Sequence, residues 1–163
     1  MISWQYNAEL VHELPDGTYG FVYRINFTDG TYYIGKKKCI TETTLPMLKN
    51  GERRPNSILK GTRVNLTSKE RENRTTAQKK AGVSTKRTFK EVVIKESKWR
   101  DYEGSSEFTS DLKIASKVIL CFCPSKRNLT YSEIRYQFKL DAIESSKCRN
   151  VCINNQFFRD NIK

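Results

Sequence analysis

The sequence has few apolar residues and lacks a long hydrophobic run. Apolar side chains make up 37% of its 163 residues, and the mean hydropathy is −0.68. The longest continuous apolar stretch runs from Val118 to Cys123, whereas a membrane-spanning helix needs about 20 such residues. The N-terminus also lacks the basic, apolar and small-residue order of a secretory signal. We therefore expect one cytoplasmic domain, residues 1–163, with no membrane partner.

The cysteines are few and odd in number, which argues against a disulfide framework. Cys39, Cys121, Cys123, Cys148 and Cys152 are expected to be reduced thiols. Two closely spaced pairs among them offer four possible zinc ligands. Neither spacing matches a zinc knuckle, and the first pair lies in the apolar run with both side chains on one face of a strand. Buried structural thiols are the favoured interpretation.

Acidic residues are too few to balance the basic ones. The chain has 30 Lys and Arg against 18 Asp and Glu, a net charge of +12. The segment from Lys36 to Arg100 alone holds 19 basic and 6 acidic residues. So localised an excess indicates a polyanionic partner, with nucleic acid the first candidate and anionic lipid the second. No amphipathic basic helix supports the lipid alternative.

Within that segment, residues 41–88 are predicted to be a long basic insertion. Thr, Asn, Lys and Arg dominate it, and we expect a long loop with one short helix near Ser68 to Lys80. A long loop in a compact domain is usually functional or partly disordered. We favour an arm that contacts DNA over a solvated surface loop. Its paired cations are the expected phosphate ligands: Arg53, Arg54, Lys79, Lys80, Lys86 and Arg87.

The rest of the chain predicts a small α/β fold. Two β-rich runs, residues 20–27 and 31–35, surround the turn signal Thr28-Asp29-Gly30 and predict a hairpin. The apolar run 118–123 predicts a third, buried and central strand. Helices are expected over 89–99, 111–116 and 130–143, and Tyr131, Ile134 and Phe138 give the last one an apolar face. The prediction is a three-stranded sheet flanked by helices.

The hairpin carries residues that resemble a known family. Phe21-Val22-Tyr23 and Tyr33-Ile34-Gly35-Lys36-Lys37 resemble the paired motif of the GIY-YIG nucleases, with phenylalanine and valine in place of the first two letters. Lys98-Trp99-Arg100-Asp101-Tyr102 followed by Gly104-Ser105-Ser106 resembles a segment of phage-encoded members. The last predicted helix resembles the family's glutamate helix, with Glu133 in the metal-binding place. Asn150 lies in a segment similar to the one that closes the domain.

This resemblance implies a three-stranded antiparallel sheet with flanking helices and metal-dependent hydrolysis of DNA phosphodiesters. It implies that Glu133 holds Mg²⁺ or Mn²⁺, that Tyr23 is the general base and that Tyr33 bonds water or phosphate. Neighbouring cations are expected to lower the pKa of the base. Lys98 or Arg100 would supply the catalytic positive charge. The expected phosphate or DNA contacts are Gly35, Lys36, Lys37, Tyr102, Ser105 and Asn150.

Other interpretations of the same residues stay open. The tyrosines are ordinary strand aromatics if the motif is accidental, and Glu133 has the spacing of a capping-box partner of Thr130. Asn150 is as compatible with a turn or cap as with a site. The alternatives to an endonuclease are an inactive nucleic-acid-binding member of the same fold and an RNA-binding protein. A single site per chain suggests a homodimer for double-strand cutting, and a phage protein would act in the host cytoplasm.

Overall fold

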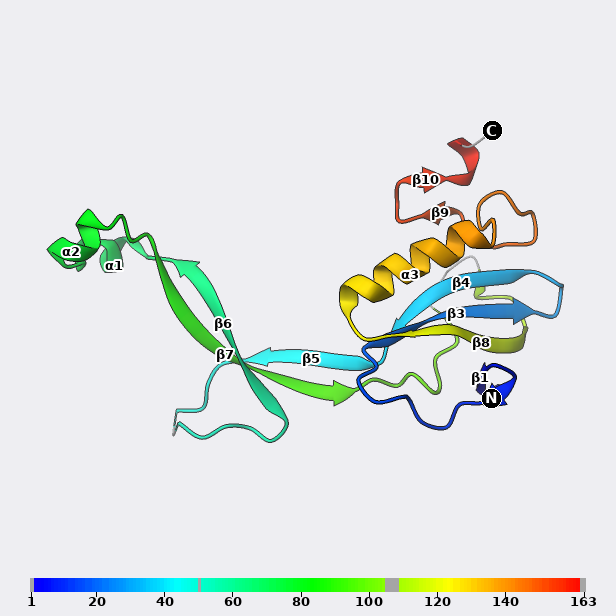
Figure 1. The fold of residues 1–163 in the computed structure, drawn as a ribbon, viewed down its shortest axis with the longest axis horizontal. Helices are drawn as coiled ribbons and strands as arrows, with labels where there is room; N and C mark the ends of the chain where they lie inside the picture. The colour runs from blue at the N-terminus through cyan, green and yellow to red at the C-terminus, as the bar shows by residue number, and fades with distance from the viewer. Residues whose placement is uncertain (1, 50, 105–108, 162–163) are drawn as a thin grey trace. The chain divides into compact units, whose positions relative to one another are not determined.

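A computed structural model describes residues 2–49, 51–104 and 109–161, which form two compact units. One unit combines Met1–Ile40 with Glu96–Lys163, and the other is Thr41–Lys95. The first unit contains a five-stranded sheet and the one long helix, and the second contains a three-stranded sheet with two short helices (Figure 1). In the described part of the chain, no helix is long and apolar enough to cross a membrane.

The sheet of the first unit has the order β2-β1-β8-β3-β4 (Figure 1). Its antiparallel part comprises β3 (Gly20–Phe27), β4 (Tyr32–Lys38) and β8 (Ile114–Cys123), so the predicted hairpin is confirmed. Two short strands, β1 (Trp4–Tyr6) and β2 (Glu9–Leu10), extend it, with β1 parallel to β8. The predicted count of three strands is therefore corrected to five, with β8 in the middle.

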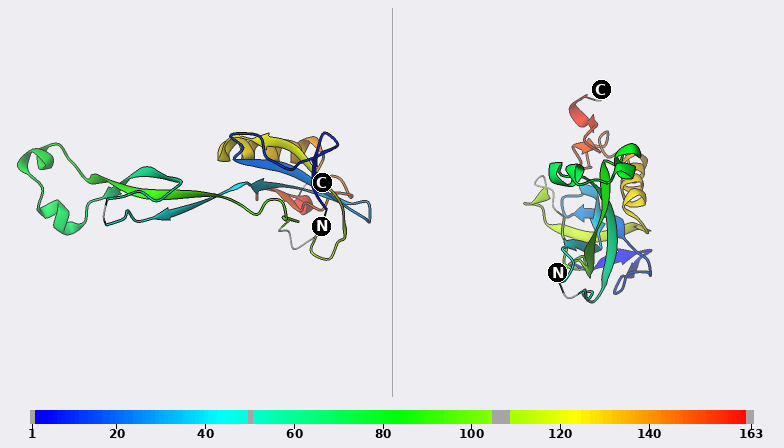
Figure 2. Two further views of the ribbon diagram at one scale, coloured as in Figure 1. Left: turned by 90° about the horizontal axis from the view of Figure 1, so that it is seen from below. Right: turned by 90° about the vertical axis from the view of Figure 1, so that its left-hand side faces the viewer.

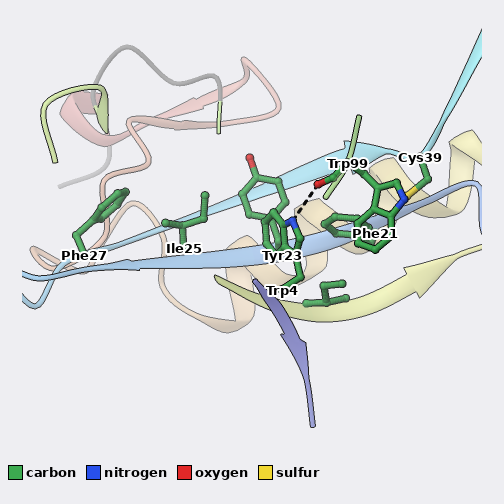
Figure 3. Packing of buried hydrophobic residues seen from close by; sticks show 8 residues of the cluster. Trp4, Phe21, Tyr23, Ile25, Phe27, Cys39 and Trp99 are labelled. Carbon is green, nitrogen blue, oxygen red and sulfur yellow. Dashed lines mark hydrogen bonds between the residues drawn. The ribbon is translucent and has the colours of Figure 1, made fainter. Parts of the chain in front are cut away.

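Side chains of β3 alternate between two apolar layers, as the two-residue period of a strand requires. Phe21, Tyr23, Ile25 and Phe27 pack on one face with residues such as Trp4 and Trp99 (Figure 3). On the other face, Val22 packs in a second layer with Ile34 and with Leu129 of helix α3. The sheet is thus covered on both faces, which explains how a chain with few apolar residues builds a core.

Helix α3 (Lys126–Lys139) begins earlier and ends earlier than the sequence predicts. Its N-cap is Ser125, whose hydroxyl accepts a hydrogen bond from the Asn128 amide. The predicted apolar face is also wrong, because Tyr131 is 65% exposed and Phe138 is 45% exposed. Leu129 and Gln137 are the buried residues of this helix. The cap after Pro124 sets the start of the helix and therefore which face meets the sheet.

Two other predicted helices are absent from the described residues. Residues 89–96 belong to strand β7 (Thr85–Glu96), and residues 97–99 are irregular. The segment 111–116 is a turn that leads into β8 at Ile114. The helix predicted over 89–99 is wrong because the run Val92-Val93-Ile94 has β-branched side chains, and these favour a strand. Strand β8 contains partly exposed residues, among them Leu120, Cys121 and Phe122, as well as buried ones, which corrects the expectation that the run 118–123 is fully buried.

The second unit is a β-hairpin with helices at its tip, not a loop. Strands β5 (Ile40–Leu45), β6 (Ser57–Asn65) and β7 form a sheet in the order β5-β7-β6. Helices α1 (Ser68–Glu72) and α2 (Thr76–Lys80) connect β6 to β7, as two further views show (Figure 2). Thr67 and Thr75 cap them through complete capping boxes. The one short helix predicted near 68–80 is therefore corrected to two short helices, and the predicted loop around it is corrected to strands.

The C-terminal residues of the first unit form a small hairpin. Strand β9 (Cys152–Ile153) pairs with β10 (Phe157–Phe158), and a 3-10 turn follows over Arg159–Asn161. Arg159 donates hydrogen bonds to the carbonyls of Ala142, Cys148 and Asn150. These bonds tie the hairpin to the segment that follows α3.

Candidate active site

Three tyrosine rings meet on the face of the sheet opposite α3. Tyr23 comes from β3, Tyr33 from β4 and Tyr102 from the segment after Trp99. The hydroxyls of Tyr23 and Tyr102 lie 3.3 Å apart, and their ring centroids are 5.8 Å apart. The centroid of Tyr33 lies 6.4 Å from that of Tyr23. The structure therefore brings together the two motif tyrosines and a third that the sequence assigned to DNA contact.

Gly35 makes room for this cluster. It lies directly opposite Tyr23 in the β3–β4 ladder. A Cβ atom on Gly35 would lie 2.6 Å from the Tyr23 hydroxyl oxygen and 2.9 Å from a ring carbon of Tyr33. Both distances are shorter than any tolerable carbon contact, so a larger residue would displace the rings. In the protein without DNA, the rings of Tyr23 and Tyr33 explain why position 35 requires a glycine. The close approach of a phosphate is not needed to explain it.

Glu133 lies on α3 at the edge strand β4. Its carboxylate Oε2 is 2.6 Å from the ammonium of Lys36, which also donates to the Thr130 hydroxyl at 3.5 Å. The Glu133 side chain is 16% exposed. The capping-box interpretation is wrong, because the helix begins at Ser125 and Glu133 lies in its middle. A carboxylate, an ammonium and a hydroxyl therefore meet on the α3 side of β4, and the charge of the carboxylate acts on Tyr23 and Tyr33.

The pKa values of the tyrosines shift opposite to the expected direction. Burial, aided by Tyr102, Tyr33 and Glu133, raises the pKa of Tyr23 well above its usual value. Burial and the nearby Glu133 carboxylate also raise the pKa of Tyr33 to about 12. The neighbouring lysines face other groups: Lys36 pairs with Glu133, and the Lys37 ammonium lies 3.9 Å from the Tyr102 ring centroid. The hydroxyls are therefore neutral at neutral pH.

Asn150 fastens the strand that carries Tyr33 and Gly35. Its Oδ1 accepts a hydrogen bond from the Ile34 amide at 2.9 Å, and its Nδ2 donates to the Ile34 carbonyl at 2.8 Å. The Cys148 thiol donates to the same Oδ1. The Asn150 side chain is buried, and both its oxygen and its nitrogen are hydrogen-bonded to the outer edge of β4. It is therefore not placed to contact DNA, which the sequence had suggested.

A comparison with family models finds a match over residues 64–162 to the model described as "Putative endonuclease segE, GIY-YIG domain". The chain belongs to this GIY-YIG family. No curated protein and no solved structure matches the chain. The matched range contains Tyr102, Glu133 and Asn150 but does not include the β3–β4 hairpin. The hairpin motif and the family match are thus separate indications of the same GIY-YIG family, which is a family of nucleases.

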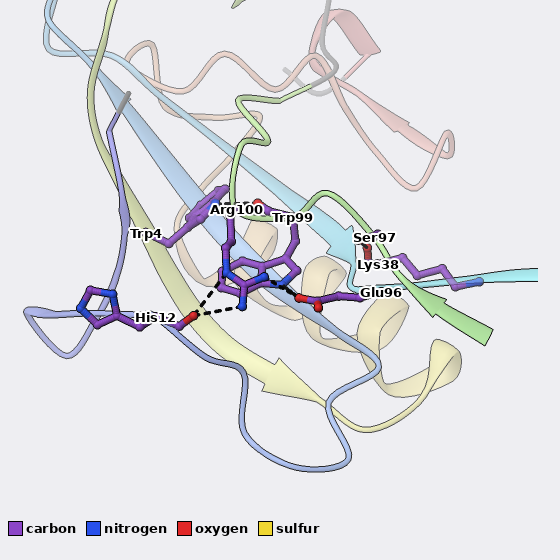
Figure 4. Close-up of polar contacts among 7 residues, drawn as sticks. All are labelled: Trp4, His12, Lys38, Glu96, Ser97, Trp99 and Arg100. Carbon is purple, nitrogen blue, oxygen red and sulfur yellow. Dashed lines mark hydrogen bonds and ion pairs between the residues drawn. The ribbon is translucent and has the colours of Figure 1, made fainter. Parts of the chain in front are cut away.

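The two candidates for the catalytic cation of a GIY-YIG site, Arg100 and Lys98, differ in their surroundings. The Arg100 guanidinium pairs with Glu96 at 2.7 Å, donates to the His12 carbonyl and lies 4.5 Å from the Trp99 ring centroid (Figure 4). Lys98 is exposed and forms no hydrogen bond or ion pair within the part of the chain that the structure describes. Arg100 is thus engaged in structural contacts, which leaves Lys98 free to meet a ligand.

Lys117 supports the tyrosine cluster, and the sequence did not predict this role. It is fully buried on β8, and its ammonium donates to the carbonyls of Tyr102 at 3.2 Å and Arg100 at 3.4 Å. The Trp4 indole donates to the Trp99 carbonyl at 2.9 Å in the same region. Burial lowers the pKa of Lys117. No pattern marks this lysine, because a lysine next to an apolar run usually faces solvent.

The basic residues predicted to bind phosphate in the second unit differ in their surroundings. Arg54 pairs with the fully buried Glu91, and Lys86 pairs with Glu70. The remaining four are exposed: Arg53, Lys79, Lys80 and Arg87. Ser105 lies outside the described residues. Arg54 therefore has a structural role, and four exposed cations remain available to a polyanion.

Proposed function

We propose that this protein is a metal-dependent endonuclease that hydrolyses DNA phosphodiester bonds. The observation that carries the proposal is the Glu133 carboxylate at the edge of the motif hairpin, close enough for its charge to raise the pKa values of Tyr23 and Tyr33. Membership of a nuclease family supports the reaction class. The net charge of +12 supports a polyanionic substrate.

The donor set around Glu133 fits a hard divalent ion such as Mg²⁺ or Mn²⁺. Among the residues that the structure describes, no three His, Cys, Asp or Glu side chains gather as ligands. Mg²⁺ needs only one or two carboxylates, since water fills its other positions. A bound ion supplies positive charge to the phosphate and to the leaving oxygen. Glu133 would hold it, and Lys36 would be released from Glu133 to contact a phosphate oxygen.

Tyr23 is the proposed general base, and Tyr33 orients the attacking water or the phosphate. Since the pKa of Tyr23 is raised, only a small fraction is ionised at neutral pH, but that fraction is strongly basic. The cleavage rate is therefore expected to climb about tenfold per pH unit across the mildly alkaline range. Tyr102, bonded to Tyr23, holds the hydroxyl in place, and Lys98 is the candidate for the missing arginine.

Two contacts favour a second candidate, a nucleic-acid-binding member of the fold that does not cut. In the free protein Lys36 occupies the carboxylate of Glu133, and Arg100 is bound to Glu96 and His12. Both arrangements must change before catalysis. We also propose that the protein cuts both strands as a homodimer, that residues 41–88 are a basic insertion that contacts DNA, and that the protein acts in a host cytoplasm.

Nicking of supercoiled plasmid separates the two candidates. We expect wild-type protein to nick plasmid with Mg²⁺ and not with EDTA, and Glu133→Gln to abolish nicking while DNA binding persists. Glu13→Gln, an exposed glutamate on a loop of the same unit, is the matched control. Binding without nicking by the wild type would support the inactive candidate. Nicking by Glu133→Gln at the wild-type rate would place the metal elsewhere.

A further inference from the structure

The β6–β7 hairpin has an outer part in which both faces are exposed. We call residues 60–65 of β6 and 85–90 of β7 the ribbon. The two strands pair antiparallel throughout it, from Lys60 opposite Lys90 to Asn65 opposite Thr85. No Asp or Glu lies in either segment. Its exposed cations are Lys60, Arg63, Lys86, Arg87 and Lys90.

Like charges face one another across the ribbon. Lys60 lies directly opposite Lys90, and Arg63 lies directly opposite Arg87. Because the two pairs are three positions apart, they lie on opposite faces of the ribbon. Directly opposed like charges destabilise an antiparallel pair, and a two-stranded hairpin is only marginally stable in water. A polyanion placed against the ribbon would relieve this repulsion.

An exposed aromatic ring shares a face with the arginine pair. Phe89 is 47% exposed and lies opposite Gly61. The Arg87 guanidinium carbon lies 5.2 Å from the Phe89 ring centroid. A Cβ atom on Gly61 would lie 2.7 Å from Arg87 Nε, so the glycine lets the guanidinium lie across the strand. The face thus presents a bare aromatic ring beside two arginines, Arg63 and Arg87.

We propose that this face binds the minor groove of duplex DNA, with Phe89 inserted between base pairs as a wedge that bends the duplex. The inference rests on DNA as the substrate in the proposed function. Apolar side chains that enter a base step do so from the minor groove and kink the duplex. Arginines beside them favour the same groove, because its narrow stretches concentrate negative potential. The ribbon lies entirely in the second unit and so needs none of the tyrosine cluster.

The test measures binding and bending with the full chain carrying Glu133→Gln, so that the DNA stays intact. A short duplex with a dye at each end reports bending by energy transfer. We expect the parent to bend it and Phe89→Ala to bind about tenfold more weakly without bending, as loss of one stacking ring predicts. Phe89→Leu should keep most of the bend. Ile58→Ala is the matched control, because Ile58 is 53% exposed on β6 outside the ribbon.

The outcomes distinguish this inference from the proposed function. Equal bending by Phe89→Ala, or binding by the parent without any bend, would overturn the wedge and leave the nuclease proposal standing. Bending that survives an excess of a minor-groove-binding drug would overturn the choice of groove. A parent chain that binds no duplex DNA would overturn DNA as the substrate, and the wedge with it.

Discussion

At the scale of single residues, Gly35 shows how one missing side chain determines an arrangement of three rings. The position opposite Tyr23 holds no Cβ, and the Tyr23 hydroxyl and Tyr33 ring lie in that space. The hairpin motif predicted that the two tyrosines lie on paired strands, and the structure places their ring centroids 6.4 Å apart. The motif could not predict that Arg100 donates to the His12 carbonyl or that Lys117 is buried beside Trp4, because such contacts depend on neighbours brought together from distant segments.

Replacing this glycine tests the steric argument. Gly35→Ala should lower the free energy of unfolding by about 1–3 kcal/mol, the usual cost of overpacking a core, and should reduce nicking strongly because the hydroxyls move. Gly61→Ala is the matched control for stability, since a Cβ there meets only the end of the flexible Arg87 side chain. Urea unfolding measures both. A Gly35→Ala protein as stable and active as the wild type would contradict the crowding.

Because thiol and phenol groups are buried, the free energy of unfolding should depend on pH in the alkaline range. Burial raises the pKa of Cys39 from 9.0 to about 12 and that of Tyr33 from 10.0 to about 12. The unfolded chain loses these protons first, so the stabilisation is complete below pH 9 and is lost as pH rises toward 12. Between its pKa in the unfolded chain and its pKa in the folded protein, each group lowers the free energy of unfolding by up to about 1.4 kcal/mol per pH unit.

We therefore expect the free energy of unfolding, measured in urea with a reductant, to fall from pH 9 upward. Cys39→Ala should make the part of the decline that begins near pH 9 shallower, because Cys39 contributes to it together with the buried thiols of Cys123 and Cys148, whose pKa values are also raised. The part that begins near pH 10 should remain. Cys152→Ala, a partly buried thiol on β9, is the control. If Cys39→Ala shows the same decline as the wild type, the thiol ionises at its ordinary pKa and is not desolvated.

At the scale of elements, local patterns predicted the β3–β4 hairpin and misassigned the long segment between it and β8. Alternation and the Asp-Gly turn define β3 and β4, and the family glutamate falls on α3 as expected. Strand β7 resembles a helix in the sequence because its charged residues obscure the two-residue period until β6 is known to pair with it. The basic segment resembles a loop for the same reason. Pairing between distant strands is not visible in either strand alone.

The edge strand β4 depends on Asn150, which substitutes for a neighbouring strand. Asn150→Ala leaves the Ile34 amide and carbonyl without their partners, at a cost of about 1–3 kcal/mol for buried polar groups. We expect a lower melting temperature, faster amide hydrogen exchange at Ile34 and weaker nicking. Asn128→Ala, at an exposed asparagine of α3 where the helical backbone accepts alanine, is the control. Unchanged exchange at Ile34 would show that β4 is held by other contacts.

At the scale of the whole molecule, the positive charge is concentrated in one of the two units. The segment 41–95 holds 14 Lys and Arg against 5 Asp and Glu, a net of +9 out of the total of +12. The catalytic candidates Tyr23, Tyr33 and Glu133 all belong to the other unit. This division predicts that DNA affinity and catalysis respond to different substitutions.

The dependence of DNA affinity on salt tests that division. Each phosphate contact contributes about −0.9 to the slope of log affinity against log salt, because bound cations release counterions. The triple variant Arg53→Gln, Lys79→Gln, Lys80→Gln removes exposed cations and should flatten the slope by about 2–3 units, with nicking at saturating DNA preserved.

Arg54 is kept, because losing it would leave Glu91 buried without its partner and destabilise the unit. The pair Lys126→Gln, Arg127→Gln on α3 is the control. If this pair reduces the slope as much per charge as the triple variant, DNA responds to net charge alone, and the second unit is not the DNA-holding surface.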